Sequence, residues 1–141
     1  MLSRKGLALI AVAVLIGASL TMAGCGKKTV AGATAAETAQ AFAAALEAGE
    51  YVLAATGFDY ITDARKQNEN WDDIPPGERG QIITKLTAMK AEELPAYKQK
   101  LGKSIKCGSA QGGTISLTGD AGSFSLELKQ MDGKYYISNV W

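Results

Sequence analysis

The sequence contains no histidine and only two cysteines, Cys25 and Cys107. Without histidine there can be no Ser-His-Asp triad, no Cys-His dyad and no His-ligated zinc site. Two cysteines alone build neither a disulfide framework nor an ordinary structural zinc site. The catalytic and metal classes that rest on these groups are therefore excluded, and the sequence indicates no cofactor and no metal.

A strong excess of charge of one sign is also missing. After the N-terminal leader, whose only charges are Arg4 and Lys5, the chain carries 13 of the 15 basic residues and all 14 acidic residues. A chain so close to neutrality has no strong field for attracting polyanions, so nucleic acid is not an expected partner. The length of 141 residues predicts one domain with one small core.

The N-terminus has the pattern of an export signal. Two basic residues are followed by an uncharged apolar run, residues 6–20, and then by small residues up to Cys25. A positive start followed by a short apolar run is typical of a secretory signal peptide. The four residues Met22-Ala23-Gly24-Cys25 resemble a bacterial lipobox, with methionine where leucine is usual.

This resemblance implies cleavage between Gly24 and Cys25 and attachment of lipid to Cys25. It also implies an extracytoplasmic protein anchored to the cell membrane or the outer membrane, and it divides the chain into a signal peptide (1–24), a lipidated cysteine with its tether (25–33) and a domain (34–141). Two alternatives stay open. The uncharged stretch 6–26 exceeds the ~20 residues that span a bilayer, and a plain signal peptide could precede an unmodified cysteine.

The first half of the remaining chain has helical patterns. Thr34 and Glu37 form a capping box, in which the threonine oxygen accepts from the Glu37 amide and the carboxylate returns to the threonine amide. We expect this helix to end at Gly49 and a short helix to cover residues 50–55. The polar stretch 63–75 predicts a surface loop.

A longer helix is expected to begin at Pro76. Its apolar positions, spaced at about 3.6 residues, are Ile82, Ile83, Leu86 and Met89. Because proline lacks the amide hydrogen, Pro95 should end or kink this helix.

From residue 104 onward the apolar positions alternate with polar ones. Strands are predicted over 104–108, 114–118, 123–130 and 134–141. Asp132-Gly133 predicts a two-residue hairpin turn between the last two. The strands are apolar on one face only, so the helices must cover it. The predicted fold class is α+β, with N-terminal helices packed on a C-terminal antiparallel sheet of three to four strands.

Two local segments carry a family resemblance. Residues 41–51 (AFAAALEAGEY) and residues 131–137 (MDGKYYI) are similar to the opening helices and the terminal hairpin of small NTF2-like, or cystatin-like, lipoproteins. The resemblance implies a curved sheet wrapped around a long helix, leaving a cone whose open end can hold a ligand. It supplies no catalytic residue, because no enzymatic motif of that family aligns with this chain.

The candidate ligand-binding residues are Tyr60, Tyr136 and Trp141, whose aromatic rings could line a pocket or a binding face. The alternative interpretation is that these rings are core or edge packing. We expect Cys107 to be a small buried hydrophobic residue. Asp72-Asp73 could ligate a cation but lack the spacing of a calcium loop, which favours a solvated loop.

Two function hypotheses follow from the sequence. The first is a non-enzymatic, membrane-anchored module that binds a small ligand or an envelope protein. The alternative is a small-pocket NTF2-like enzyme in which Asp59 or Asp63 and Tyr60 act as acid-base groups.

The lipobox predicts the mass of the mature protein. Protein recovered from the membrane fraction should begin at Cys25 and carry acyl chains, because stable anchoring needs more than one chain. Cys25→Ala should leave the chain uncleaved and unlipidated. Intact-mass measurement of both proteins tests this, and a cleaved wild-type chain without lipid would contradict it.

Overall fold

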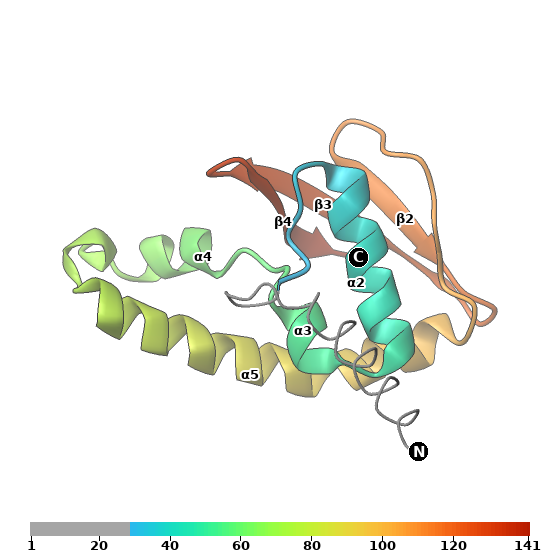
Figure 1. Ribbon diagram of the computed structural model, residues 1–141, viewed down its shortest axis with the longest axis horizontal. Coiled ribbons are helices and arrows are strands. Elements are labelled where there is room, and N and C mark those ends of the chain that lie inside the picture. The colour runs from blue at the N-terminus through green and yellow to red at the C-terminus, as the bar shows by residue number, and fades with distance from the viewer. Residues whose placement is uncertain (1–28) are drawn as a thin grey trace, which may run out of the picture.

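The computed structural model describes residues 29–141, so the lipobox and Cys25 lie outside the described residues (Figure 1). The elements in chain order are the helices α2 (Ala35–Ala48), α3 (Tyr51–Ala55), α4 (Tyr60–Gln67), the 3-10 helix η1 (Trp71–Asp73) and α5 (Pro76–Leu101), then the strands β1 (Lys106–Cys107), β2 (Thr114–Thr118), β3 (Ser123–Met131) and β4 (Lys134–Val140). The predicted α+β class is confirmed. Among the helices within this range, none combines the length and apolar character that crossing a bilayer requires.

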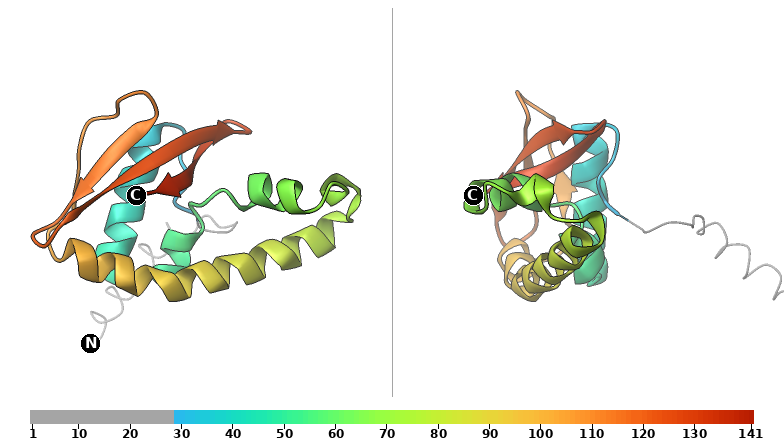
Figure 2. Two further views of the ribbon diagram at one scale, coloured as in Figure 1. Left: turned by 180° about the vertical axis from the view of Figure 1, so that it is seen from behind. Right: turned by 90° about the vertical axis from the view of Figure 1, so that its left-hand side faces the viewer.

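The four strands form one antiparallel sheet in the order β1-β2-β3-β4. Helix α2 covers one face of the sheet, while α3 and α5 lie beyond one end of it (Figures 1 and 2). The side chains that fill the interface are at most 8% exposed and include Phe42, Leu46, Ile115, Leu117, Leu126, Leu128 and Ile137. The period-two alternation therefore placed the inward residues of the strands correctly.

Helix α2 begins and ends where the sequence predicts, with one change in the cap. Thr34 Oγ1 accepts from the Glu37 amide at 3.1 Å, and Gly49 ends the helix with φ of 76°. The Glu37 carboxylate, however, accepts from the amide of Ala33 at 3.1 Å and not from that of Thr34. The cap thus extends one residue further upstream than a standard capping box.

The packed domain begins before residue 34. Val30 and Ala31 are 3% and 7% exposed, and the Gly32 carbonyl accepts from the Tyr135 amide at 2.8 Å. Residues 30–33, which we expected to belong to the tether, are therefore part of the domain. What separates Cys25 from the domain is shorter than the sequence suggested.

The stretch 63–75 is not the surface loop that its polarity predicted. Asp59 caps α4 through Oδ1, which accepts from the Thr62 amide at 3.0 Å, and α4 continues to Gln67. Trp71 follows in η1 and is only 4% exposed. The prediction was wrong because a short helix that buries few of its own side chains has no apolar stripe to reveal it.

Helix α5 runs through Pro95 without ending there. The proline ring lies on the exposed side, and its neighbours Ala91 and Leu94 are buried against the domain. Tertiary packing on this side outweighs the lost backbone hydrogen bond. The expected apolar stripe is only partly buried: Ile82 and Met89 are 36% and 60% exposed.

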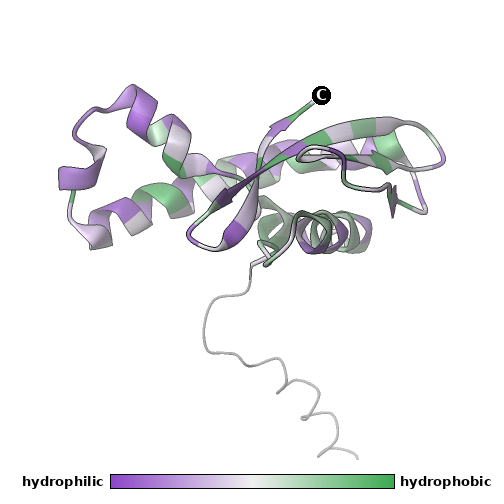
Figure 3. Cartoon of the chain, turned by 90° about the horizontal axis from the view of Figure 1, so that it is seen from above, coloured by the Kyte–Doolittle hydropathy of each residue, from purple (hydrophilic) through white to green (hydrophobic). Residues whose placement is uncertain are grey.

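The first half of α5 and α4 together form an arm that projects away from the sheet, with a hydrophilic end (Figures 1 and 3). This arm departs from the cone expected from the NTF2-like resemblance, because the long helix is not wrapped by the sheet. Helix α5 packs mainly against α3, whereas α2 is the helix that packs most extensively against the strands.

The loop after α3 joins the edge of β4 at Gly57. The Ile137 amide donates to the Gly57 carbonyl at 2.7 Å, and the Asp59 amide donates to the Ile137 carbonyl at 2.9 Å. A Cβ atom at Gly57 would overlap Cγ2 of the buried Val30. The segments around Val30, Gly57 and Ile137, which are distant in sequence, therefore meet here only because residue 57 has no side chain.

Gly57→Ala should lower the free energy of unfolding by about 1–3 kcal/mol, because the added methyl group overpacks a closed site. Urea denaturation followed by circular dichroism measures the change. Gly108→Ala is the matched control, since its Cβ would find only ordinary contacts with Ser116. Equal stability of the two variants would contradict the assignment.

Candidate ligand-binding groove

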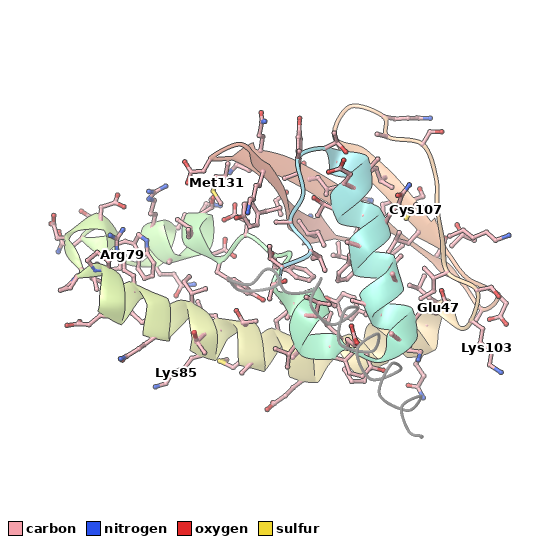
Figure 4. The ribbon with its side chains drawn as sticks, in the orientation of Figure 1. Glu47, Arg79, Lys85, Lys103, Cys107 and Met131 are labelled. Carbon is pink, nitrogen blue, oxygen red and sulfur yellow. The ribbon has the colours of Figure 1, made fainter. Side chains whose placement is uncertain are left out.

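A groove of about 580 Å³ lies between the arm and the β3–β4 hairpin. Its volume is in the range of pockets that hold small molecules. Helices α3, α4 and α5, the hairpin and Thr29 all contribute to its lining. Figure 4 shows Met131, which lines the groove near the hairpin turn, and Arg79, which does not line it but precedes the lining residue Gly80 on α5.

One face of α5 forms the floor of the groove. Its five lining residues are Gly80, Ile83, Thr84, Thr87 and Ala88. The spacing i, i+3, i+4, i+7 and i+8 places them on a single stripe, which at 1.5 Å per residue extends for about 12 Å. Lys85 lies off this stripe and points away from α4 (Figure 4).

Three threonine hydroxyls along the groove, those of Thr56, Thr84 and Thr87, already donate to the backbone. Thr84 Oγ1 donates to the Gly80 carbonyl at 2.9 Å and Thr87 Oγ1 donates to the Ile83 carbonyl at 2.7 Å. Thr56 Oγ1 likewise donates to the Leu53 carbonyl and accepts from the Val30 amide. Since their donors are used, these threonines offer a ligand mainly their methyl groups.

The remaining contributions from α3, α4 and the loop between them are mostly apolar: Val52, Phe58, Tyr60 and Ile61. The rings of Phe42 and Phe58 meet edge to face with centroids 5.6 Å apart, and Phe58 and Tyr60 are 6.5 Å apart. A continuous series of aromatic rings therefore connects the core to the groove. This series holds the first turn of α4 in place beside α5.

Tyr60 is the predicted site residue that the structure places in the groove most firmly. Its hydroxyl donates to the Ala55 carbonyl at 2.6 Å. The pKa of Tyr60 is raised above its ordinary value, chiefly because burial disfavours the phenolate; the nearby Thr87 hydroxyl, which could donate to a phenolate, lowers it and the charge of Glu93 raises it. The phenol is therefore neutral at physiological pH.

Tyr136 lines the same groove from β4, together with Lys134 and Met131. Met131 pairs with Lys134 and Lys129 with Tyr136, so Met131, Lys134 and Tyr136 share one face of the hairpin. The pKa of Tyr136 is also raised, first by burial and then by the charges of Asp132 and Asp59. The ammonium group of Lys134 supplies the positive charge among the lining residues.

Asp59 and Asp63 do not join the tyrosines. Both line a different, polar cavity of about 410 Å³ beside Lys129. The side chain of Asp59 is only 2% exposed, and its Oδ2 accepts from Thr62 Oγ1 at 2.6 Å and lies 3.9 Å from Lys129 Nζ. The acid-phenol pair on which the enzyme alternative relied is therefore divided between two cavities.

Trp141 is not part of the groove. It extends β4 by exchanging backbone hydrogen bonds with Ser125, and its residue surface is 58% exposed.

Cys107 lies on β1 beside α2 (Figure 4) and is half-buried; burial raises the pKa of its thiol, so its thiolate is disfavoured at neutral pH.

Of the acidic pair at 72–73, Asp72 is engaged by arginine. Asp72 Oδ1 lies 3.0 Å from Arg65 Nη2 and 3.8 Å from Arg79 Nη1. Within residues 29–141, no group of three or more His, Cys, Asp or Glu side chains could hold a metal ion. Asp72 and Asp73 are exposed, as expected of a solvated segment, but they lie in η1 and not in a loop.

Sequence reasoning missed most of the groove. The stripe at Gly80, Ile83, Thr84, Thr87 and Ala88 was hidden because threonine and glycine count as polar or neutral residues. The helical spacing of these five residues was the one feature of the sequence from which the stripe could have been identified. The pattern around Lys134 and Met131 indicated a hairpin and nothing about a binding surface.

Comparison of the chain with protein-family models, with curated proteins and with solved structures found no match. The α+β class thus rests on the structure alone, and the NTF2-like resemblance stays a prediction.

Tyr60→Phe should lower the free energy of unfolding by about 1 kcal/mol at neutral pH, because the Ala55 carbonyl loses the shorter of its two hydrogen bonds and keeps only that from the Phe58 amide. The pH dependence should change as well. Above the ordinary tyrosine pKa of 10.0 the unfolded chain releases the proton while the folded chain keeps it, so wild-type stability falls as pH rises. Urea titrations between pH 8 and 11 should show a shallower fall in the variant; identical slopes would contradict the buried-phenol assignment.

Proposed function

We propose that this protein is an extracytoplasmic lipoprotein, anchored through lipid on Cys25 to the cell membrane or the outer membrane. Its domain binds a small, largely apolar ligand in the groove between the arm and the hairpin, without altering it chemically. The observation that carries the binding role is that four hydroxyl groups of the groove, those of Thr56, Tyr60, Thr84 and Thr87, already donate to backbone carbonyls.

The polarity of the groove supports an apolar ligand with one polar end. A ligand that needs several hydrogen bonds would find four hydroxyls already donating to carbonyls, those of Thr56, Tyr60, Thr84 and Thr87. Apolar area buried against Val52, Ile61 and Ile83 would supply most of the binding free energy, at about 25 cal/mol per Å². The Lys134 ammonium group can donate a hydrogen bond to a carbonyl group of the ligand, or pair with an anionic group, at the edge of the groove.

The same geometry argues against the enzyme alternative. A general base in the groove would need an ionised or readily ionised group, and both phenols have raised pKa values. The nearest buried carboxylate, Asp59, faces the other cavity and caps α4. A binding role needs none of these groups to change its protonation.

We retain membership of the NTF2-like, or cystatin-like, lipoproteins as part of this proposal. The order of helices followed by a four-stranded antiparallel meander supports it. The groove lies beside α4 and α5 and not at the open end of a cone, which distinguishes this chain from the expected arrangement.

Gly80→Leu should fill the groove and weaken binding of a fluorescent alkyl probe, such as a dansylated undecanoic acid, by about tenfold or more. A Cβ at Gly80 meets no atom within 4 Å, and the residue lines the groove. The affinity loss corresponds to about 1.4 kcal/mol or more. Fluorescence titration of residues 26–141 measures it.

Gly77→Leu is the control, one turn earlier on α5. A Cβ there also finds open space, but Gly77 does not line the groove. Both substitutions replace a helical glycine and should preserve or raise helix stability. Wild-type affinity in Gly80→Leu, or equal loss in both variants, would remove the groove as the binding site.

A further inference from the structure

We infer that the occupant of the groove is an acyl chain of the lipid on the protein's own Cys25. This inference rests on the proposed function, because it requires that Cys25 is lipidated and that the groove takes an apolar ligand. It adds the identity of that ligand and its source. Three properties support it: the reach of the chain, the length of the groove and the chemistry of its lining.

The lipid is close enough to enter. Thr29 itself lines the groove, and Cys25 is four residues upstream. Four residues span at most about 13–14 Å when fully extended. The chain is also fixed where it enters the domain, because the Val30 amide donates to Thr56 Oγ1 at 3.1 Å and Val30 is 3% exposed.

The groove is long enough for most of an acyl chain. The stripe from Gly80 to Ala88 extends for about 12 Å along α5. Half of a bilayer's ~30 Å hydrocarbon core, about 15 Å, is the length that an acyl chain occupies in one leaflet. The remaining few ångströms of the chain, with its ester or amide group, would then lie at the edge near Thr29 and Lys134.

The chemistry fits such a molecule at both ends. Along the floor, Ile83 and the methyl groups of Thr84 and Thr87 face the chain, since the hydroxyls donate to backbone carbonyls. At the edge, the Lys134 ammonium group can donate to the carbonyl oxygen of an acyl ester. A sugar, a nucleotide or a peptide carries many polar groups, and these would find few hydrogen-bond partners on the floor of the groove.

Occupancy of the groove would weaken the anchor. A single acyl chain gives only marginal, reversible membrane binding, whereas two or more hold firmly. Each chain taken up by the groove is removed from the bilayer. The domain would therefore exchange a chain between its own groove and the membrane next to it.

Photocrosslinking in the full-length protein tests this directly. Bacterial cells expressing the chain are fed a palmitate analogue with a diazirine in mid-chain, irradiated, and the purified protein is digested and analysed by mass spectrometry. The expected result is label on Cys25 joined within the same molecule to the peptide that carries Ile83 and Thr87. Gly80→Leu should reduce this crosslink at least fivefold, and Gly77→Leu should not.

The remaining outcomes separate the inference from the function on which it depends. No label at Cys25 would overturn both. Label at Cys25 whose crosslinks reach only membrane lipids, or equal crosslinks in Gly80→Leu and Gly77→Leu, would overturn the inference and leave the anchor intact. Crosslinks to the groove that persist in Cys25→Ala would mean that a free fatty acid or a bilayer lipid is the occupant, which also overturns it.

Discussion

The close approach of Gly57 to the edge of β4 is the constraint on which the groove depends. Backbone hydrogen bonds of 2.7 and 2.9 Å join Gly57 and Asp59 to Ile137, and they fix the direction in which α4 leaves the domain. Tyr60 is the next residue, so its ring is delivered to the groove by the same contact. Val30 packs against the glycine, which brings the N-terminal segment to the same place.

Beyond this junction the structure depends on fewer buried contacts. In the arm, Trp71 is buried, whereas Asp72 and its partner Arg65 are exposed and its second partner, Arg79, is half-buried. Exposed ion pairs contribute little to stability, typically below about 1 kcal/mol each. The floor of the groove lies on the first half of α5, which is less buried than the second half. Because few buried contacts hold this half in place, it can move to admit a ligand more readily than the core can.

The sequence predicted the parts of the fold in which local pattern and tertiary packing agree. The strands and α2 alternate or repeat with a clear period, and Asp132-Gly133 turns with positive φ at both residues, as a hairpin requires. It failed where packing overrides local preference. Pro95 stays inside α5 because Ala91 and Leu94 are held by the core, and α4 was hidden because it is polar nearly all round.

The candidate site was predicted only in part for a related reason. Tyr60 and Tyr136 were identified as aromatic anchors and line one groove, but Trp141 belongs to an exposed strand end. The apolar character of the floor cannot be inferred from composition, because Thr84 and Thr87 become apolar surfaces only when their hydroxyls donate to carbonyls one turn back.

The position of the groove connects the two halves of the proposed function. Because residues 30–33 pack into the domain, at most about 13–14 Å of chain separates Cys25 from Thr29 at the groove. A lipid on Cys25 would therefore hold the groove next to the bilayer, and would not suspend it at a distance. A ligand would then pass between membrane and groove without crossing open water. Exposing each of its CH₂ groups to water would cost about 0.8 kcal/mol, and the short path avoids part of that free energy.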